Sequence, residues 1–217
     1  MSEKAKIGQA GKSNYHHGDL ATTIMELAIE EIAQQGTERL SLRLLARQAG
    51  VSQTAPYRHF PTKTCLLAAL ATRGFVELRE RVRSIVESDA PIETRFIGMG
   101  VSYVEFALEN PVLYQLMFGG VVADFSAYES LQTAAKACYM EVRRCEQELI
   151  AAKRIPHEDV RLGGAIWAGV HGIASLLLNM QPGPEVGRER NDPRSAVQAM
   201  RADVEDTVRI LFGRMVE

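Results

Sequence analysis

The segment from Leu42 to Leu67 constrains this chain more than any other part of its sequence. Small and branched apolar residues recur there with the spacing of one helix face, at Leu42, Leu45, Ala46 and Ala49. Ser41 stands just before this stripe and is suited to cap a helix. Gly50 follows the stripe, and we expect it to make a turn with a positive φ. The pattern predicts a short helix that ends in a tight turn.

A second helix is expected to begin directly after that turn. Ser52 can cap it, and residues 53–55 would form its exposed first turn. Pro56 falls at the edge of that turn, where a missing N–H costs little. Residues 39–76 contain no carboxylate, although the whole chain has a net charge of −2, and their basic residues are Arg39, Arg43, Arg47, Arg58, Lys63 and Arg73. Two short helices in a local positive field predict a helix-turn-helix that reads a DNA major groove.

These residues resemble the N-terminal domain of the TetR family of transcriptional regulators. The family pattern is found here as Leu45-Ala46, Ala49-Gly50-Val51-Ser52, Tyr57, His59-Phe60, Lys63 and Leu66. Residues 15–20, YHHGDL, resemble the start of the first helix in one large subgroup. The chain departs from the pattern at Thr54 and Pro56, where glycine and an aliphatic residue are commoner. The resemblance implies an all-α protein with an N-terminal arm and three-helix helix-turn-helix DNA-binding domain (1–65) and a C-terminal helical ligand-binding and dimerisation domain (66–217).

The resemblance also implies roles for single residues. Tyr57, His59 and Lys63 would contact phosphates, whereas Gln53 and Thr54 would face base edges. The expected DNA-binding set is Ser41, Arg43, Ser52, Gln53, Thr54, Tyr57, His59 and Lys63. The competing interpretation is an ordinary corner between two helices with a solvated arginine face. Phe60 is expected in the core rather than stacked on a base.

After residue 66 the pattern is helical, with no strand alternation. Proline, glycine and asparagine divide it into helices expected over about 61–87, 91–109, 111–118, 127–153, 157–180 and 195–215. The penultimate helix carries four glycines, Gly163, Gly164, Gly169 and Gly172, and these suggest a close approach by another backbone. The last helix has a sustained apolar stripe, Val197, Met200, Val204, Val208, Leu211 and Met215. These two helices predict a homodimer through a four-helix bundle, or else they cover their own core.

Large, adaptable apolar residues gather in the middle helices, and they predict a small-molecule effector pocket. Its expected lining is Tyr103, Phe106, Tyr114, Met117, Phe118, Tyr139, Trp167 and His171. Residues 167–178 also resemble a Trp…His-Gly signature of one TetR C-terminal subclass. The effector is expected to be apolar or amphipathic. Each of these residues could equally be a satisfied core residue.

Other chemistry finds little support in the sequence. Three cysteines form no framework, and Cys138 and Cys145 are interpreted either as buried fillers or as a thiol sensor. His16-His17 has no third ligand nearby, so neither a metal nor a cofactor is expected. No catalytic triad order or glycine-rich phosphate loop points to an enzyme. The start of the chain has no apolar signal segment, and no apolar run reaches the length of a bilayer span. We therefore expect a cytoplasmic protein without a membrane partner.

The sequence therefore predicts a homodimeric DNA-binding regulator, in particular a repressor released from a double-stranded, palindromic operator by a small hydrophobic effector. An alternative is an effector-independent architectural or division-related protein on the same scaffold. The two differ in one structural expectation, because the effector-independent protein should have a filled core where the regulator has a cavity.

Overall fold

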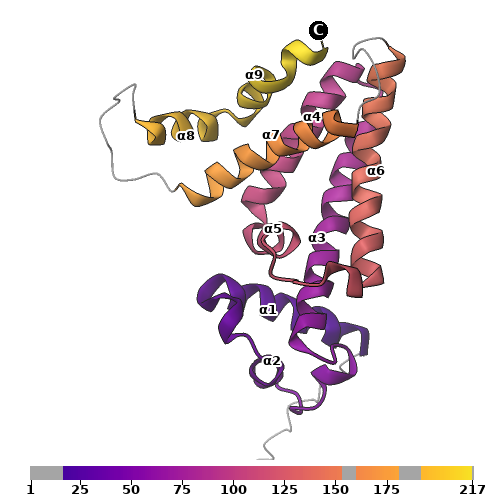
Figure 1. The fold of residues 1–217 in the computed structure, drawn as a ribbon. Coiled ribbons are helices and arrows are strands. Elements are labelled where there is room, and N and C mark those ends of the chain that lie inside the picture. The colour runs from indigo at the N-terminus through magenta and orange to yellow at the C-terminus, as the bar shows by residue number, and fades with distance from the viewer. Residues whose placement is uncertain (1–16, 153–159, 181–191, 217) are drawn as a thin grey trace, which may run out of the picture. The chain divides into compact units, whose positions relative to one another are not determined.

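The computed structural model describes residues 17–152, 160–180 and 192–216, and every regular element within them is helical (Figure 1). The all-α prediction is confirmed. The chain divides into two compact units, of which the first ends at Lys63 and the second begins at Thr64. The N-terminal arm, Tyr15 and His16 lie outside the described residues.

The first unit contains α1 (His17–Arg39), α2 (Leu42–Gln48) and a short 3-10 helix, η1 (Pro56–Arg58). Its core comes from apolar residues four apart on α1, which meet the stripe of α2; the buried members are Leu20, Ile24, Ala28, Ile32, Leu42, Leu45 and Ala46. Phe60 is buried as well, as predicted. Ser41 caps α2 through a hydrogen bond from Leu44 N–H to its Oγ (3.2 Å), and Gly50 has a φ of +69°. Both local predictions are confirmed.

The predicted helix from Ser52 does not form. Residues 53–55 make a turn, and only Pro56–Arg58 is helical, as a single 3-10 turn. The cause is Pro56, because an α-helix capped at Ser52 needs a hydrogen bond from residue 56 to the Ser52 carbonyl, and proline has no N–H. Ala55 N–H donates to that carbonyl instead (2.9 Å), which is the tighter 3-10 pattern. The expectation from the sequence that a missing N–H at position 56 costs little was therefore wrong.

The second unit is built from seven α-helices and one 3-10 turn among its described residues. They are α3 (Lys63–Val86, with Lys63 in the first unit), α4 (Ile92–Glu109), α5 (Pro111–Phe118), η2 (Phe125–Ala127), α6 (Glu129–Ala151), α7 (Val160–Asn179), α8 (Pro193–Ala202) and α9 (Val204–Val216). Helix α4 is central, since it packs against α5, α6, α7 and α9. Pro91 and Pro111 start α4 and α5 where the sequence predicted, because proline is tolerated at a helix start and not inside one.

The last predicted helix is broken in two at Asp203. This residue leaves helical geometry (φ −145°), and its Oδ1 accepts the N–H of Asp206 (2.8 Å), so it caps α9. The predicted stripe is therefore divided. Val197 on α8 and Val208 on α9 are buried, whereas Leu211 is 47% exposed. The side chain of Met215 lies outside the described residues.

Helix α7 also corrects the expectation that no segment could span a bilayer. Arg161–Asn179 is long and apolar enough by length and composition. However, Ile166, Val170 and Ile173 on this helix are buried within the second unit, as in the core helix of a globular domain.

Candidate DNA-binding surface and effector cavity

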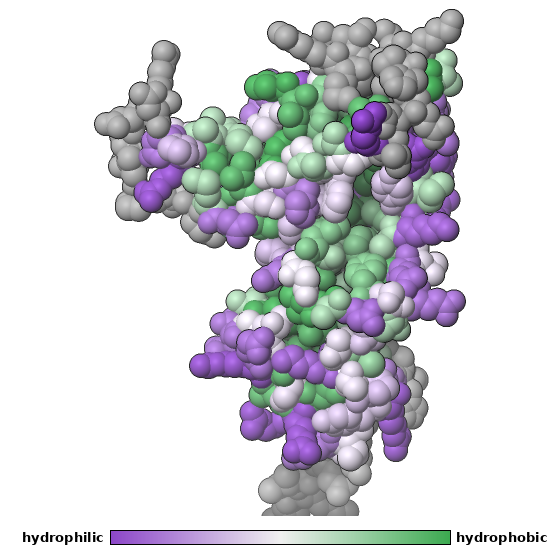
Figure 2. Space-filling model, in the orientation of Figure 1, coloured by the Kyte–Doolittle hydropathy of each residue, from purple (hydrophilic) through white to green (hydrophobic). Residues whose placement is uncertain are grey.

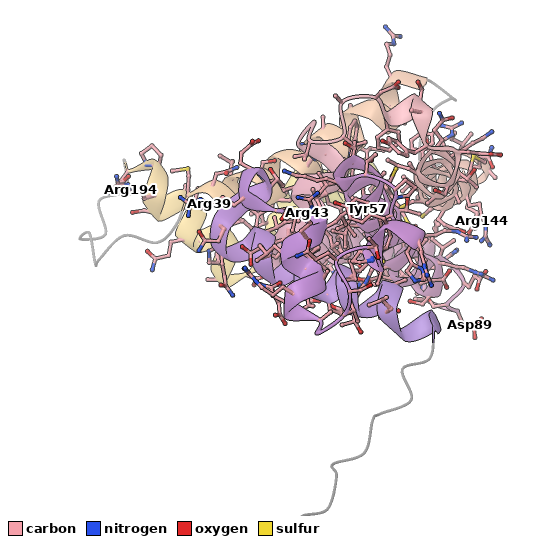
Figure 3. All side chains as sticks on the ribbon, turned by 90° about the horizontal axis from the view of Figure 1, so that it is seen from below. Arg39, Arg43, Tyr57, Asp89, Arg144 and Arg194 are labelled. Carbon is pink, nitrogen blue, oxygen red and sulfur yellow. The ribbon has the colours of Figure 1, made fainter. Side chains whose placement is uncertain are left out.

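All eight residues predicted to bind DNA lie in the first unit. Four of them, Arg43, Ser52, Gln53 and Thr54, are exposed around the turn that follows α2. A shallow hollow brings several together, with a lining of Ser41, Arg43, Leu44, Arg47, Val51 and Gln53. Figure 3 shows this unit from below, with Arg43 and Tyr57 labelled on it. Tyr57 is 42% exposed, although Pro56 beside it is buried.

The charges of this surface are available to a ligand. The guanidinium groups of Arg43, Arg47 and Arg58 are exposed and make no ion pair or hydrogen bond with any described residue. The Lys63 ammonium donates only to the Glu38 carbonyl (3.3 Å), an exposed and uncharged partner. A duplex can therefore engage these cations without first breaking an ion pair.

The second unit encloses a cavity of about 410 Å³. Its described wall contains no acidic or basic side chain and is formed by Phe75, Leu78, Val82, Phe96, Met99, Gly100, Tyr103, Met117, Phe118, Phe125, Ala135, Cys138, Tyr139, Val142, Gly163, Ile166, Trp167, Val170 and Phe212. Tyr139 and Trp167 are 44% and 48% exposed, so they form part of the rim. Figure 2 shows the corresponding recess of apolar surface between α6 and α7. The volume falls in the range typical of small-molecule sites.

The cavity wall contains part of the predicted effector set, namely Tyr103, Met117, Phe118, Tyr139 and Trp167. Phe106 is not in the wall: it is fully buried, and the Arg81 guanidinium lies over its ring (5.5 Å from the centroid). The 100° turn per residue of a helix explains this, because Phe106 is rotated away from the cavity although it shares a broad face with Tyr103.

Sequence reasoning missed the contribution of α3 and α9 to this wall. Phe75, Leu78 and Val82 line it from α3, and their spacing of three and four residues was visible in the sequence. That stripe shows that these side chains face inward, but it does not show whether they pack against other side chains or line a cavity. Phe212 enters from α9, and no local pattern signals a contact between segments so far apart in the chain.

A polar cluster stands at the cavity wall, where Tyr103 (α4), Tyr114 (α5) and His171 (α7) meet. The two hydroxyls lie 3.1 Å (Tyr103) and 2.8 Å (Tyr114) from His171 Nδ1. Trp167 Nε1–H donates to the Tyr103 oxygen (3.3 Å). Tyr114 and His171, both in the predicted set, thus lie behind the wall and support Tyr103.

Burial keeps this cluster uncharged. Loss of solvation raises the pKa of Tyr103 and the pKa of Tyr114, and it lowers the pKa of His171. Neutral imidazole and neutral phenols are therefore the forms present at neutral pH. The ring of Phe118 packs edge-on against Tyr114 and His171, with centroids 5.1 and 5.4 Å away.

The cysteines are better described as fillers than as sensors. Cys138 lies in the cavity wall and Cys145 is fully buried. Burial raises the pKa of each thiol to about 12. Because the thiolate is the nucleophile, this shift favours the interpretation of both residues as buried fillers.

Ion pairs tie α3 to α6, two helices that share the cavity wall. The buried Glu141 carboxylate accepts from Arg79 of α3 (3.3 Å) and from Arg144 of its own helix (2.9 Å). Nearby, buried Glu146 pairs with Arg143 through Oε2 (2.6 Å), while its enclosed Oε1 has no hydrogen-bond partner among the described residues. No group of His, Cys, Asp and Glu within the described part of the chain is placed to hold a metal ion.

Comparison with known proteins matches both units to one family. A model of bacterial regulatory proteins of the tetR family matches residues 24–70, and a model of the tetracyclin repressor-like C-terminal domain matches residues 96–204. The nucleoid occlusion factor SlmA of Haemophilus influenzae is 30% identical over 151 residues, which cover 70% of this chain and 66% of SlmA, just under two thirds. An HTH-type transcriptional regulator of Mycobacterium tuberculosis is 24% identical over 172 residues, or 77% of this chain and 86% of that protein.

Solved structures share this fold. A protein of unknown function from Rhodococcus sp. RHA1 is 33% identical with a TM-score of 0.70, and the match covers 89% of this chain and 97% of that one. The fatty acid degradation regulator FadR from Bacillus halodurans shares the fold at 15% identity, with a TM-score of 0.64 and coverage of 88% and 97%. With a family helix-turn-helix followed by a family C-terminal domain, this chain belongs to the TetR family of transcriptional regulators and is a DNA-binding protein of the helix-turn-helix type.

Proposed function

We propose that this protein is a cytoplasmic, homodimeric repressor that leaves a palindromic operator when a small apolar molecule enters the cavity of the second unit. The observation that carries the proposal is the cavity itself, about 410 Å³ with an apolar wall. A core that served only stability would be filled, because empty space in a protein interior costs free energy.

The DNA-binding part of the proposal rests on the unpaired cations of the first unit. Arg43, Tyr57 and Lys63 would fix the protein on the phosphates, and Gln53 and Thr54 would read base edges. The turn at 53–55 presents these two side chains to solvent even though no long recognition helix forms. One such unit reads few base pairs, so useful affinity requires two, in successive major grooves about 34–36 Å apart.

The proposed dimer interface is the outer face of α7 together with α9. Gly164 and Gly172 have no atom of the described residues within 4 Å of an added Cβ, so no contact in the described part of the protomer explains why glycine is there. Leu176 and Ile210 are 45% and 77% exposed. Exposing large apolar side chains to water is unfavourable, and a partner subunit that covers them would remove this cost. Gly169 is different, because a Cβ there would lie 2.7 Å from Phe212 of the same chain.

The proposed link between cavity and DNA is helix α3. It begins at Lys63 in the DNA-binding surface, and its Phe75, Leu78 and Val82 line the cavity. At Gly74 an added Cβ would lie 2.5 Å from Sδ of Met117, another wall residue, so α3 and α5 leave no slack between them. A ligand that displaces Met117 would therefore move α3. DNA is released only if the ligand binds this shifted state better than the operator-bound state.

The test of the proposed function is a selection on fragmented genomic DNA. Purified protein should enrich a palindrome whose half-sites are centred about one helical turn apart, or a multiple of it. Sedimentation should give a dimer, and Gly172→Leu should dissociate it, whereas Arg83→Ala on a distant helix should not. Retention of DNA without sequence enrichment, or a monomeric wild type, would contradict the proposal.

A second candidate function is DNA binding without an effector, and the similarity to the nucleoid occlusion factor SlmA favours it. A protein of that kind would bind DNA and need no ligand. The apolar cavity is the observation against it. The two candidates differ in the laboratory, because only the first predicts that a small molecule bound in the cavity weakens operator binding.

A further inference from the structure

We propose that the effector is an uncharged molecule with an apolar body and one hydrogen-bond acceptor, and that the Tyr103 hydroxyl recognises this acceptor. The inference rests on the proposed function and specifies the chemistry of the same cavity.

The wall excludes a charged ligand. None of its described residues is acidic or basic. The buried carboxylate of Glu146 is paired with Arg143. A Cβ at Gly163 would lie 3.3 Å from Glu146 Oε2, so this paired carboxylate lies just behind the wall and offers no positive charge to an anion. Its enclosed Oε1 does not line the cavity. An unpaired charge transferred from water into such a site loses its hydration with no counter-charge to replace it.

The described wall carries few polar side-chain groups, and among them the Trp167 N–H is already donated to Tyr103. Cys138 is a weak donor, and Tyr139 lies at the rim with 44% of its surface exposed. Tyr103 is 8% exposed and faces the cavity from central helix α4. An acceptor on the ligand would therefore meet Tyr103 in a desolvated setting, where a hydrogen bond gives the most selectivity.

Tyr103 can donate its hydroxyl proton to a ligand, and His171 Nδ1 still keeps a hydrogen-bond partner. Both tyrosine hydroxyls compete for His171 Nδ1, which offers one lone pair in one tautomer and one proton in the other. The shorter contact belongs to Tyr114 (2.8 Å against 3.1 Å), so this nitrogen keeps Tyr114 as a partner when Tyr103 turns to a ligand. Trp167 meanwhile donates to the Tyr103 oxygen, which polarises its O–H toward an acceptor.

The experiment uses full-length protein and four probes with the same chain length. Methyl decanoate carries an ester acceptor, decanoate an anion, decyltrimethylammonium a cation, and decane no polar group. Binding is followed by the fluorescence of Trp167, the sole tryptophan, which stands in the cavity wall. Methyl decanoate should bind most tightly. Tyr103→Phe should weaken it by roughly fivefold to tenfold and leave decane unchanged. The control is Tyr128→Phe, at a tyrosine that does not line the cavity, and it should alter neither.

Three results would overturn the inference. The first is tighter binding of decanoate or decyltrimethylammonium than of the ester. The second is an equal loss of ester and decane binding in Tyr103→Phe, which would mean that the ring shapes the cavity and the hydroxyl recognises nothing. The third is binding of no probe at all. If a charged probe binds and releases operator DNA, the proposed function survives and only the uncharged class fails; if probes bind without affecting DNA, the effector part of the proposed function fails.

Discussion

The arginines of the two units differ in whether carboxylates pair with them. In the first unit, Arg43, Arg47 and Arg58 are exposed and have no partner among the described residues. In the second, arginines such as Arg79, Arg95 and Arg143 are held by carboxylates. A surface that binds phosphates must keep its cations available, whereas a unit that encloses an apolar cavity must neutralise its own charges. The difference in pairing fits DNA binding by the first unit and the ligand binding that we propose for the second.

The largest expected effect comes from removing cations of the first unit. The double variant Arg43→Ala and Lys63→Ala should lose roughly 3 kcal/mol or more of DNA affinity, because each hydrogen bond to a charged group contributes about 1.5–3 kcal/mol. The loss should be similar for all duplexes, and the slope of log K against log salt should become shallower by roughly 1.8. Arg83→Ala, which removes a cation paired with Glu87, serves as the control. An unchanged salt slope in the double variant would show that these cations do not meet phosphates.

A smaller and more selective effect is expected at the turn after α2. Gln53→Ala should cost about 1–3 kcal/mol on the selected operator, since glutamine pairs with adenine edges in the major groove. Competition binding against operators changed at single positions measures this. Loss of discrimination at one base pair in each half-site is the expected result. A loss that is equal for every sequence would place Gln53 on the backbone instead.

In the second unit, the matching test removes a charge that the protein neutralises internally. Glu141→Gln should lower the free energy of unfolding by about 1–3 kcal/mol, because Arg79 and Arg144 lose a buried charged acceptor. Denaturant unfolding followed by circular dichroism gives the value. The control is Glu205→Gln, whose exposed pair with Arg209 on the surface of α9 should contribute about 0–1 kcal/mol. Equal effects of the two changes would show that the buried ion pairs of Glu141 contribute no more to stability than the exposed pair of Glu205.

The smallest effect concerns pH. Burial lowers the pKa of His171, so the unfolded chain takes up this proton before the folded one. The stability that depends on neutral His171 is fully present above the unfolded pKa of about 6.5, and it is lost as the pH falls through the lower folded-state pKa. Thermal unfolding across this window should therefore show a steeper loss in wild type than in His171→Gln. Parallel pH profiles would mean that Tyr103 and Tyr114 hold the charged imidazole as well as the neutral one.

Local sequence signals predicted the structure correctly where they depend only on neighbouring residues in the chain. Ser41, Gly50 and Pro111 each act within a few residues, and the structure places each as predicted. Two local signals were misread: Pro56 removes the N–H that an α-helix from Ser52 requires, and Asp203 caps α9 inside what looked like one continuous stripe. The spacing Asp203-x-x-Asp206 resembles a capping box, and this pattern in the sequence could have predicted that a new helix begins after Asp203.

The cavity was harder to predict because its wall is assembled across the chain. An amphipathic stripe shows that Phe75, Leu78 and Val82 point inward, yet it carries no information on whether they meet side chains or space. Phe106 shows the opposite error, because a large aromatic residue near the cavity is simply core. The cluster around His171 needed coordinates as well, since α4, α5 and α7 each supply one member.

The most direct measurement of the central claim is the affinity of methyl decanoate for the free protein and for the protein saturated with its selected operator. If the first unit binds DNA and the second controls it, the ester must bind the free protein more tightly, and DNA must bind the ester-free protein more tightly by the same factor. Equal affinity of the ester for both forms, with Trp167 reporting full occupancy, would contradict the account.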